Sequence, residues 1–326
     1  MKSGAWRLAL IAVILGIAWW LRDGFGDVGG ALDKAGWSGV VILTLYHLLP
    51  MTLCGLSWAA LQVGEPRLKL WVFVMGRWIR DGVGEMAGFI PLSGEMAGIR
   101  HLTRFGVRAP VAGAGVVVDI TAEAAGQFLF SLAGVAMWAW LYPHSDVTRW
   151  GVVALLVAMP VLAGMVLVQR SWFVHFLETL PSRLMPKSWD APDLEQGVLA
   201  SINDIYRRRG RVALSVGWHL AGWLAGAAEA WVGLHLLGMP LGLAEVLAME
   251  SIIFAIRSVA FIVPGAIGLQ EGGYMLFGSM LGLPTEVALA LSLLKRGREL
   301  ILGLSALLAW HFIEAATARA RARDKA

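Results

Sequence analysis

The stretch from Pro110 to Tyr142, PVAGAGVVVDITAEAAGQFLFSLAGVAMWAWLY, decides the fold, because only Asp119 and Glu123 among its 33 residues are charged. A helix of about 20 mainly apolar residues is long enough to cross the hydrocarbon core of a bilayer. This stretch is therefore predicted to span a membrane. Five other stretches meet the same criterion, and they lie near 6–22, 37–62, 150–169, 212–237 and 285–311.

The composition of the whole chain agrees with this prediction. Hydrophobic residues make up 58% of the 326 residues, charged residues make up 15%, and the mean hydropathy is +0.67. Soluble domains contain about 45–50% apolar and about 25% charged residues, so a water-soluble globule is excluded. We expect an all-α, polytopic integral membrane helical bundle with about six full spans, in a single transmembrane domain over residues 1–326. The single cysteine, Cys54, excludes an intrachain disulfide.

Two further apolar stretches, 71–90 and 244–263, carry internal charges and end next to prolines, Pro91 and Pro264. Each proline opens a loop that contains glycine and ends at a glutamate. Pro and Gly that interrupt hydrophobic segments at corresponding positions of two halves are typical of transporter binding sites. We therefore predict two broken or re-entrant helices.

The recurrence of this pattern predicts an inverted repeat, with residues 37–142 as the first unit and residues 212–311 as the second. In this topology the first broken helix starts from the cytoplasmic side and the second from the outside. A chance recurrence is the alternative, because Pro and Gly are frequent in membrane helices.

The distribution of Lys and Arg predicts the orientation. With both termini in the cytoplasm, cytoplasmic segments hold 18 of the 27 cations, external loops hold 3, and 6 lie at membrane depth. This bias follows the positive-inside rule and predicts this orientation in an inner (cytoplasmic) membrane. The stretch 6–22 lacks a following cleavage site and is interpreted as a signal anchor.

The segment 170–211 is predicted to be a cytoplasmic loop that contains one amphipathic helix. Asp193 is a plausible N-cap, and the apolar residues that follow at helical spacing are Leu194, Val198, Ile202 and Ile205. The run Arg207, Arg208, Arg209 and Arg211 comes next. The helix is interpreted as an anchor on the inner leaflet, or alternatively as a site for anionic lipids or a partner protein.

Charged residues at membrane depth are the candidate functional residues, because an unpaired Asp, Lys or Arg at a helix centre costs roughly 2.5–3.5 kcal/mol. Asp119 and Glu123 lie four residues apart and share one helix face, as do Lys295 and Glu299. We expect these polar stripes to meet near the midplane around a hydrated cavity that admits a polar head group. Buried ion pairs that only fix the helix register are the alternative.

Four motifs at these positions resemble the hopanoid-biosynthesis-associated membrane proteins (HpnL-like). They are Gly76–Asp81 (GRWIRD), Val116–Glu123 (VVVDITAE), Phe261–Gly273 (FIVPGAIGLQEGG) and Leu291–Leu300 (LSLLKRGREL). That group is similar to a flippase-like superfamily that includes the transmembrane region of lysylphosphatidylglycerol synthases, and the resemblance covers residues 35 to 315. It implies a helical bundle that moves or handles lipid head groups. Because the chain has no soluble synthase domain after this region, the aminoacyl transfer of those enzymes is not implied.

Signatures of other functions are absent from the sequence. The seven histidines show no metal-ligand spacing such as HExxH, so no metal site is expected. Gly24–Gly29 matches GxGxxG but follows a membrane span instead of a strand, so no nucleotide cofactor is expected. No nucleophile motif or P-loop appears, and the arginine run has no aromatic platform for nucleic acid. Isolated histidines near span ends are interpreted as interfacial residues.

The leading hypothesis is a lipid transporter or flippase-like protein whose partners are membrane lipids, either hopanoids or anionic phospholipids. Cations would bind the head group, and acids would balance them or relay protons. Backbone groups at Pro264, Gly265 and Gly268 would approach the head group. The proposed side chains are Arg77, Arg80, Glu95, Asp119, Glu123, Glu250, Arg257, Gln270, Glu271, Lys295, Arg296, Arg298 and Glu299. The alternatives are a membrane-embedded enzyme that modifies lipid head groups, and a scaffold for lipid-biosynthetic enzymes. The sequence does not define the oligomeric state.

Overall fold

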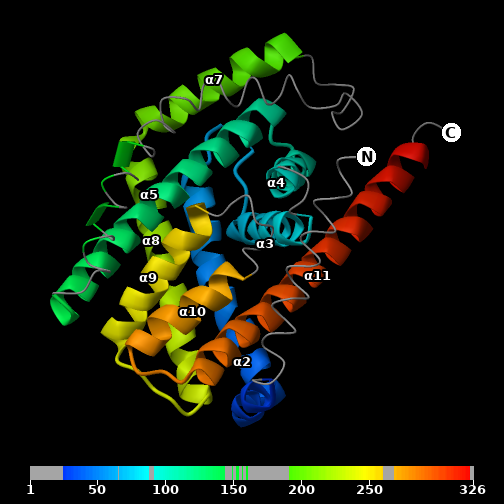
Figure 1. The fold of residues 1–326 in the computed structure, drawn as a ribbon. Helices are drawn as coiled ribbons and strands as arrows, with labels where there is room; N and C mark the ends of the chain where they lie inside the picture. Colours follow the sequence, from blue (N-terminus) through cyan, green and yellow to red (C-terminus); the bar gives the residue numbers. More distant parts are fainter. Residues whose placement is uncertain are drawn as a thin grey trace, which may run out of the picture.

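The computed structural model describes residues 25–64, 66–87, 92–143, 191–259 and 268–323, with a few isolated positions between 149 and 160. All regular structure in this part of the chain is helical (Figure 1). The helices are α2 (Phe25–Ala60), α3 (Leu70–Met86), α4 (Ser93–Arg104), α5 (Ala109–Leu141), α7 (Ala191–Arg207), α8 (Arg209–Leu236), α9 (Leu243–Val259), α10 (Leu269–Met280) and α11 (Thr285–Arg323). The predicted all-α class is confirmed for the described residues.

Three helices among the described residues are long and apolar enough to cross a membrane. Their apolar parts are Val28–Ala60, Ala109–Leu141 and Thr285–Thr317, and they contain the predicted spans 37–62, 110–142 and 285–311 almost entirely. The predicted span 212–237 coincides with α8, which is helical but is not one of these three. The predicted span 6–22 and most of 150–169 lie outside the described residues, so the number of six spans stays a prediction.

The helix α2 is bent near its beginning. Gly36 has φ 58° and ψ −168°, so two helical segments meet there at an angle. Glycine tolerates this positive φ because it has no Cβ to clash with the backbone. Further along, Pro50 lies inside the same helix and removes one backbone hydrogen bond. The longest apolar helix near the N-terminus is therefore not a straight rod.

Each predicted broken segment is followed by a short helix. The helix α3 has 17 residues and precedes the 12-residue α4, while α9 has 17 residues and precedes the 12-residue α10. The proline loops between the members of each pair lie outside the described residues. The helices α3 and α4 pack against each other, as do α9 and α10, and α2 packs along α8.

Small residues let the long and short helices approach closely. A Cβ on Gly82 of α3 would lie 2.4 Å from Cβ of Ala306 on α11. A Cβ on Gly134 of α5 would lie 1.6 Å from Oγ of Ser251 on α9. Helix association in lipid depends on close van der Waals packing, which small residues permit. These contacts fix α3 on α11 and α9 on α5.

The amphipathic helix α7 differs from its predicted role. It begins at Ala191, so the expected N-cap Asp193 lies inside its first turn. Val198, Ile202 and Ile205 are buried and pack against Leu61 and against the first turns of α5. These three side chains are covered by protein and cannot insert into the inner leaflet, and this corrects the interpretation of this part of the helix as a membrane-surface anchor.

We predict that Gly134→Ala lowers the thermal unfolding midpoint of the purified protein in detergent. The added methyl group would meet both Oγ and Cβ of Ser251, at 1.6 and 2.3 Å, and overpacking of this kind costs about 1–3 kcal/mol. Gly226→Ala on α8 is the matched control, because a Cβ there has no neighbour within 4 Å. It should leave the midpoint unchanged or raise it slightly. Equal midpoints for the two variants would contradict the close α5–α9 contact.

Candidate functional site

A buried carboxylate on α5 receives two arginines from α3. Asp119 is 0% exposed. Its Oδ2 accepts hydrogen bonds from Nη1 of Arg77 at 3.3 Å and from Nη1 of Arg80 at 2.5 Å. Arg77 and Arg80 are three residues apart, so both guanidinium groups leave α3 on one face. The arginines predicted at membrane depth are thus neutralised by the long helix that follows α3 and α4 in the chain.

Arg77 contacts three carboxylates. Its Nη1 and Nη2 donate to the two oxygens of Glu123 at 3.0 and 2.6 Å, a bidentate arrangement that fixes the orientation of the guanidinium. Its Nε donates to Asp81 at 2.6 Å. Arg80 lies 3.7 Å from Glu95 of α4. Charge-assisted bonds therefore join α3, α4 and α5 in one group, which we call the first network.

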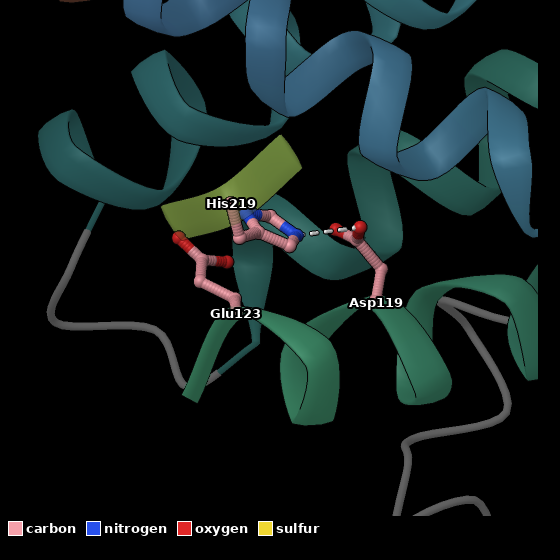
Figure 2. A group of neighbouring side chains, drawn as sticks. All are labelled: Asp119, Glu123 and His219. Atoms are coloured by element: carbon pink, nitrogen blue, oxygen red, sulfur yellow. Dashed lines mark hydrogen bonds and ion pairs between the residues drawn. The ribbon is translucent and has the colours of Figure 1, made fainter. Parts of the chain in front are cut away.

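Two other helices complete the coordination of Asp119. Nε2 of His219, on α8, lies 2.9 Å from Oδ1 of Asp119, and Figure 2 shows this ring beside both carboxylates. Ser57 of α2 donates to the same oxygen at 3.2 Å and lies 2.7 Å from Oγ of Ser215 on α8. Asp119 therefore holds four helices together.

Asp119, Glu123 and His219 also have the donor set of a metal site, since their ligand atoms lie within 4.8 Å of one another. Arg77 and Arg80 already donate to these carboxylates. A divalent cation would have to displace the guanidinium groups or lie against them. The residues present therefore fit an ion-pair network better than a metal centre.

The second half contains a compact group of three side chains. Nζ of Lys295, on α11, donates to Oε2 of Glu250 on α9 at 2.7 Å and to the hydroxyl of Tyr274 on α10 at 2.7 Å. The Tyr274 hydroxyl in turn donates to Oε1 of Glu250. Lys295 is 2% exposed and Glu250 is 0% exposed. A lysine at this depth is tolerated because every charge in the group has a partner.

Arg298 of α11 belongs to a third group of side chains, whose other members lie on α2 and α8. Its Nε lies 3.2 Å from Oε1 of Glu229 on α8. The other oxygen of Glu229 lies 2.6 Å from Nδ1 of His47 on α2, and Nη1 of Arg298 lies 2.8 Å from Nε2 of the same ring. Arg298 therefore ties α2 and α8 to α11.

The remaining predicted residues cluster where α9, α10 and α11 meet. Arg257 donates to Oε1 of Gln270 at 2.5 Å and lies 3.5 Å from Glu299. Arg296 donates to Glu271 at 3.1 Å and to Glu299 at 3.0 Å. The side chains of Arg257 and Arg296 are 21% and 19% exposed, more than the other membrane-depth cations.

Gly268 and Glu271 have a local structural role as well. The N–H of Gly268 donates to Oε2 of Glu271 at 2.7 Å, and this bond closes the first turn of α10. Gly268 has φ 83°, a conformation that glycine adopts without strain. The other two loop residues of the predicted site, Pro264 and Gly265, lie outside the described residues.

Within the described residues, the predicted charges pair inside each half of the chain. The arginines that pair with Asp119 and Glu123 belong to α3, while the carboxylates on other helices that pair with the α11 cations belong to α8, α9 and α10. The expected meeting of the α5 and α11 stripes is not seen as a direct ion pair.

Sequence reasoning missed several members of these networks. The interpretation of His47 and His219 as interfacial residues is wrong, because both contact buried carboxylates. Ser57, Glu229 and Tyr274 were not among the predicted site residues. For His47, His219 and Glu229 the available signal was position, because each lies well inside a predicted span, whereas Tyr274 lies between two predicted segments.

These helices and networks define an integral membrane protein with charged groups buried at membrane depth. The family described as "Lysylphosphatidylglycerol synthase TM region" matches residues 6–306, and the chain belongs to this family. That membership places it among membrane proteins related to lipid handling, as the resemblance implied. Comparisons with curated proteins and with solved structures gave no significant match.

We predict that Asp119→Asn strongly destabilises the protein. Removal of one charge from a buried network leaves the opposite charges uncompensated, at a cost of roughly 3–5 kcal/mol. Chemical unfolding in detergent micelles measures this loss. The control is Asp204→Asn, because Asp204 forms an exposed pair with Arg208 and such pairs contribute about 0–1 kcal/mol. A loss no larger than that of the control would show that the first network is dispensable for folding.

Proposed function

We propose that this protein moves polar lipid head groups across the bacterial inner membrane, as a flippase-like transporter. One observation carries the proposal: charged side chains at membrane depth form several extensively bonded groups on the helices of a lipid-related membrane family. Charged residues inside membrane segments are rare and usually belong to a substrate or ion path. A protein that only needed to span the bilayer would not require them.

The order and lengths of the helices support an inverted repeat. The series α2, α3, α4, α5 and the series α8, α9, α10, α11 have the same order, with 17 and 12 residues in the second and third helices of each. Packing follows the same relation, since α3 lies on α11 and α9 lies on α5. We retain the units 37–142 and 212–311, six full spans and two re-entrant pairs, with both termini in the cytoplasm.

The path for the head group is proposed to lie between the two halves. Arg257 and Arg296 are the most accessible of the membrane-depth cations, and both lie beside the beginning of α10. Backbone groups at Pro264, Gly265 and Gly268 would contribute further hydrogen bonds. The side chains proposed for the path are Arg77, Arg80, Glu95, Asp119, Glu123, Glu250, Arg257, Gln270, Glu271, Lys295, Arg296, Arg298 and Glu299.

The proposed substrates are membrane lipids with an anionic or hydroxylated head group, which include anionic phospholipids and hopanoids. Guanidinium groups bind phosphate and carboxylate in a bidentate manner, and their existing carboxylate partners can be exchanged for such a ligand. Carboxylates released in this exchange would rebalance the charge or relay protons. Lipid-biosynthetic enzymes are the proposed protein partners, as sources of the lipid.

The test is lipid movement in liposomes that contain the purified protein and labelled lipids. We expect wild-type protein to move labelled anionic phospholipid between leaflets without any change in lipid mass, and Arg298→Ala to abolish this movement. Arg298 is 6% exposed and joins three helices, so its loss removes both charge and coupling.

The matched control is Arg208→Ala, because Arg208 is an exposed arginine at the junction of α7 and α8. It should leave lipid movement intact, and thermal unfolding of both variants separates lost function from lost folding. A new lipid mass in the vesicles would indicate an enzyme. No movement and no new mass with folded wild-type protein would contradict the proposal.

A further inference from the structure

The two halves place opposite charges at equivalent positions. Arg77 is the eighth residue of α3, and Glu250 is the eighth residue of α9. Asp119 is the eleventh residue of α5, and Lys295 is the eleventh residue of α11. The first half thus has a cation on α3 and an acid on α5, whereas the second half has an acid on α9 and a cation on α11.

The same interaction is formed in both halves in spite of this reversal. Arg77 donates to Asp119 at 3.3 Å, and Lys295 donates to Glu250 at 2.7 Å. The first pair joins α3 to α5, and the second pair joins α9 to α11. Both pairs are closed and buried in this structure.

Uncharged groups form the contacts described here between α3 and α11 and between α9 and α5. Nε1 of Trp78, on α3, donates to the carbonyl oxygen of Leu302 on α11 at 3.0 Å. Nε2 of Gln127, on α5, donates to the carbonyl oxygen of Phe254 on α9 at 3.1 Å. Together with the close approaches of Gly82 and Gly134, these bonds hold α3 on α11 and α9 on α5.

This division of contacts places five of the helices in two bodies. The first body contains α3 and α11, and it also includes α4, because Arg100 of α4 donates to Glu314 of α11 at 2.6 Å. The second body contains α5 and α9. Both the Arg77–Asp119 pair and the Glu250–Lys295 pair cross from one body to the other, so a movement between the bodies must stretch them.

We propose that the Arg77–Asp119 pair and the Glu250–Lys295 pair are two ionic locks that open alternately as the two bodies rock against each other. The inference rests on the inverted topology of the proposed function. Arg77 and Glu250 each lie seven positions beyond the first residue of α3 and α9, which is about 10 Å along the helix axis. With the two helices starting at opposite membrane surfaces, the locks lie at similar depths from opposite sides.

The native cysteine provides a reporter of the first lock. Cys54 is the single cysteine of the chain, and it lies one turn before Ser57, which donates to Asp119. A Cβ on Gly222, one turn beyond His219, would lie 3.3 Å from Sγ of Cys54. Opening of the first lock should therefore expose the thiol to water.

The experiment measures how fast a membrane-impermeant maleimide labels Cys54 in the full-length protein in liposomes, with the reagent added outside or trapped inside. Asp119→Asn weakens the first lock, so we expect labelling to become several-fold faster from one side at a temperature below the thermal unfolding midpoint of the variant. Glu250→Gln weakens the second lock and favours the state in which the first is closed, so we expect labelling slower than in the wild type.

Faster labelling in both variants, or no change in either, would overturn the proposal, because independent local loosening would act without reciprocity. Arg208→Ala, far from both pairs in the described structure, should label as the wild type does. The readout needs no lipid movement, so reciprocal labelling in a protein that moves no lipid would refute the proposed function and leave the locks standing.

Discussion

The cost of an unpaired charge in a medium without water is the constraint on which this fold depends. Asp119 satisfies it with hydrogen bonds from α2, α3 and α8, so one carboxylate fixes the positions of four helices. Glu250 does the same for α9, α10 and α11 through Lys295 and Tyr274. In water these bonds would contribute little, but at membrane depth each broken bond leaves a partner that nothing replaces.

The sequence predicts the parts of this arrangement that depend on hydropathy and local breaks. An apolar run with two charges predicts α5 to within one residue at each end, and the charged apolar segments 71–90 and 244–263 predict the positions of α3 and α9. It does not predict pairing. Arg77 and Glu123 are 46 residues apart, and the choice between this partner and one on α11 depends on how the helices pack.

The predictions were wrong where a residue or helix was assigned the location that is most common for its type. Histidine is typical of membrane interfaces, but the position of His219 on its helix decides whether its ring faces lipid head groups or Asp119. The helix α7 has the apolar stripe of a membrane-surface helix, and α5 offers an equally apolar surface nearby. Hydropathy alone does not distinguish a helix covered by lipid from one covered by protein.

The docking of α7 also limits how other proteins can approach this one. A soluble enzyme that recognised the apolar face of α7 would compete with the first turns of α5 for Val198, Ile202 and Ile205. Capture of that face would strip the covering from the helix that carries Asp119. Recruitment through this face and the packed state of the bundle would therefore be mutually exclusive, whereas recruitment through the exposed arginines that follow α7 would leave the bundle intact.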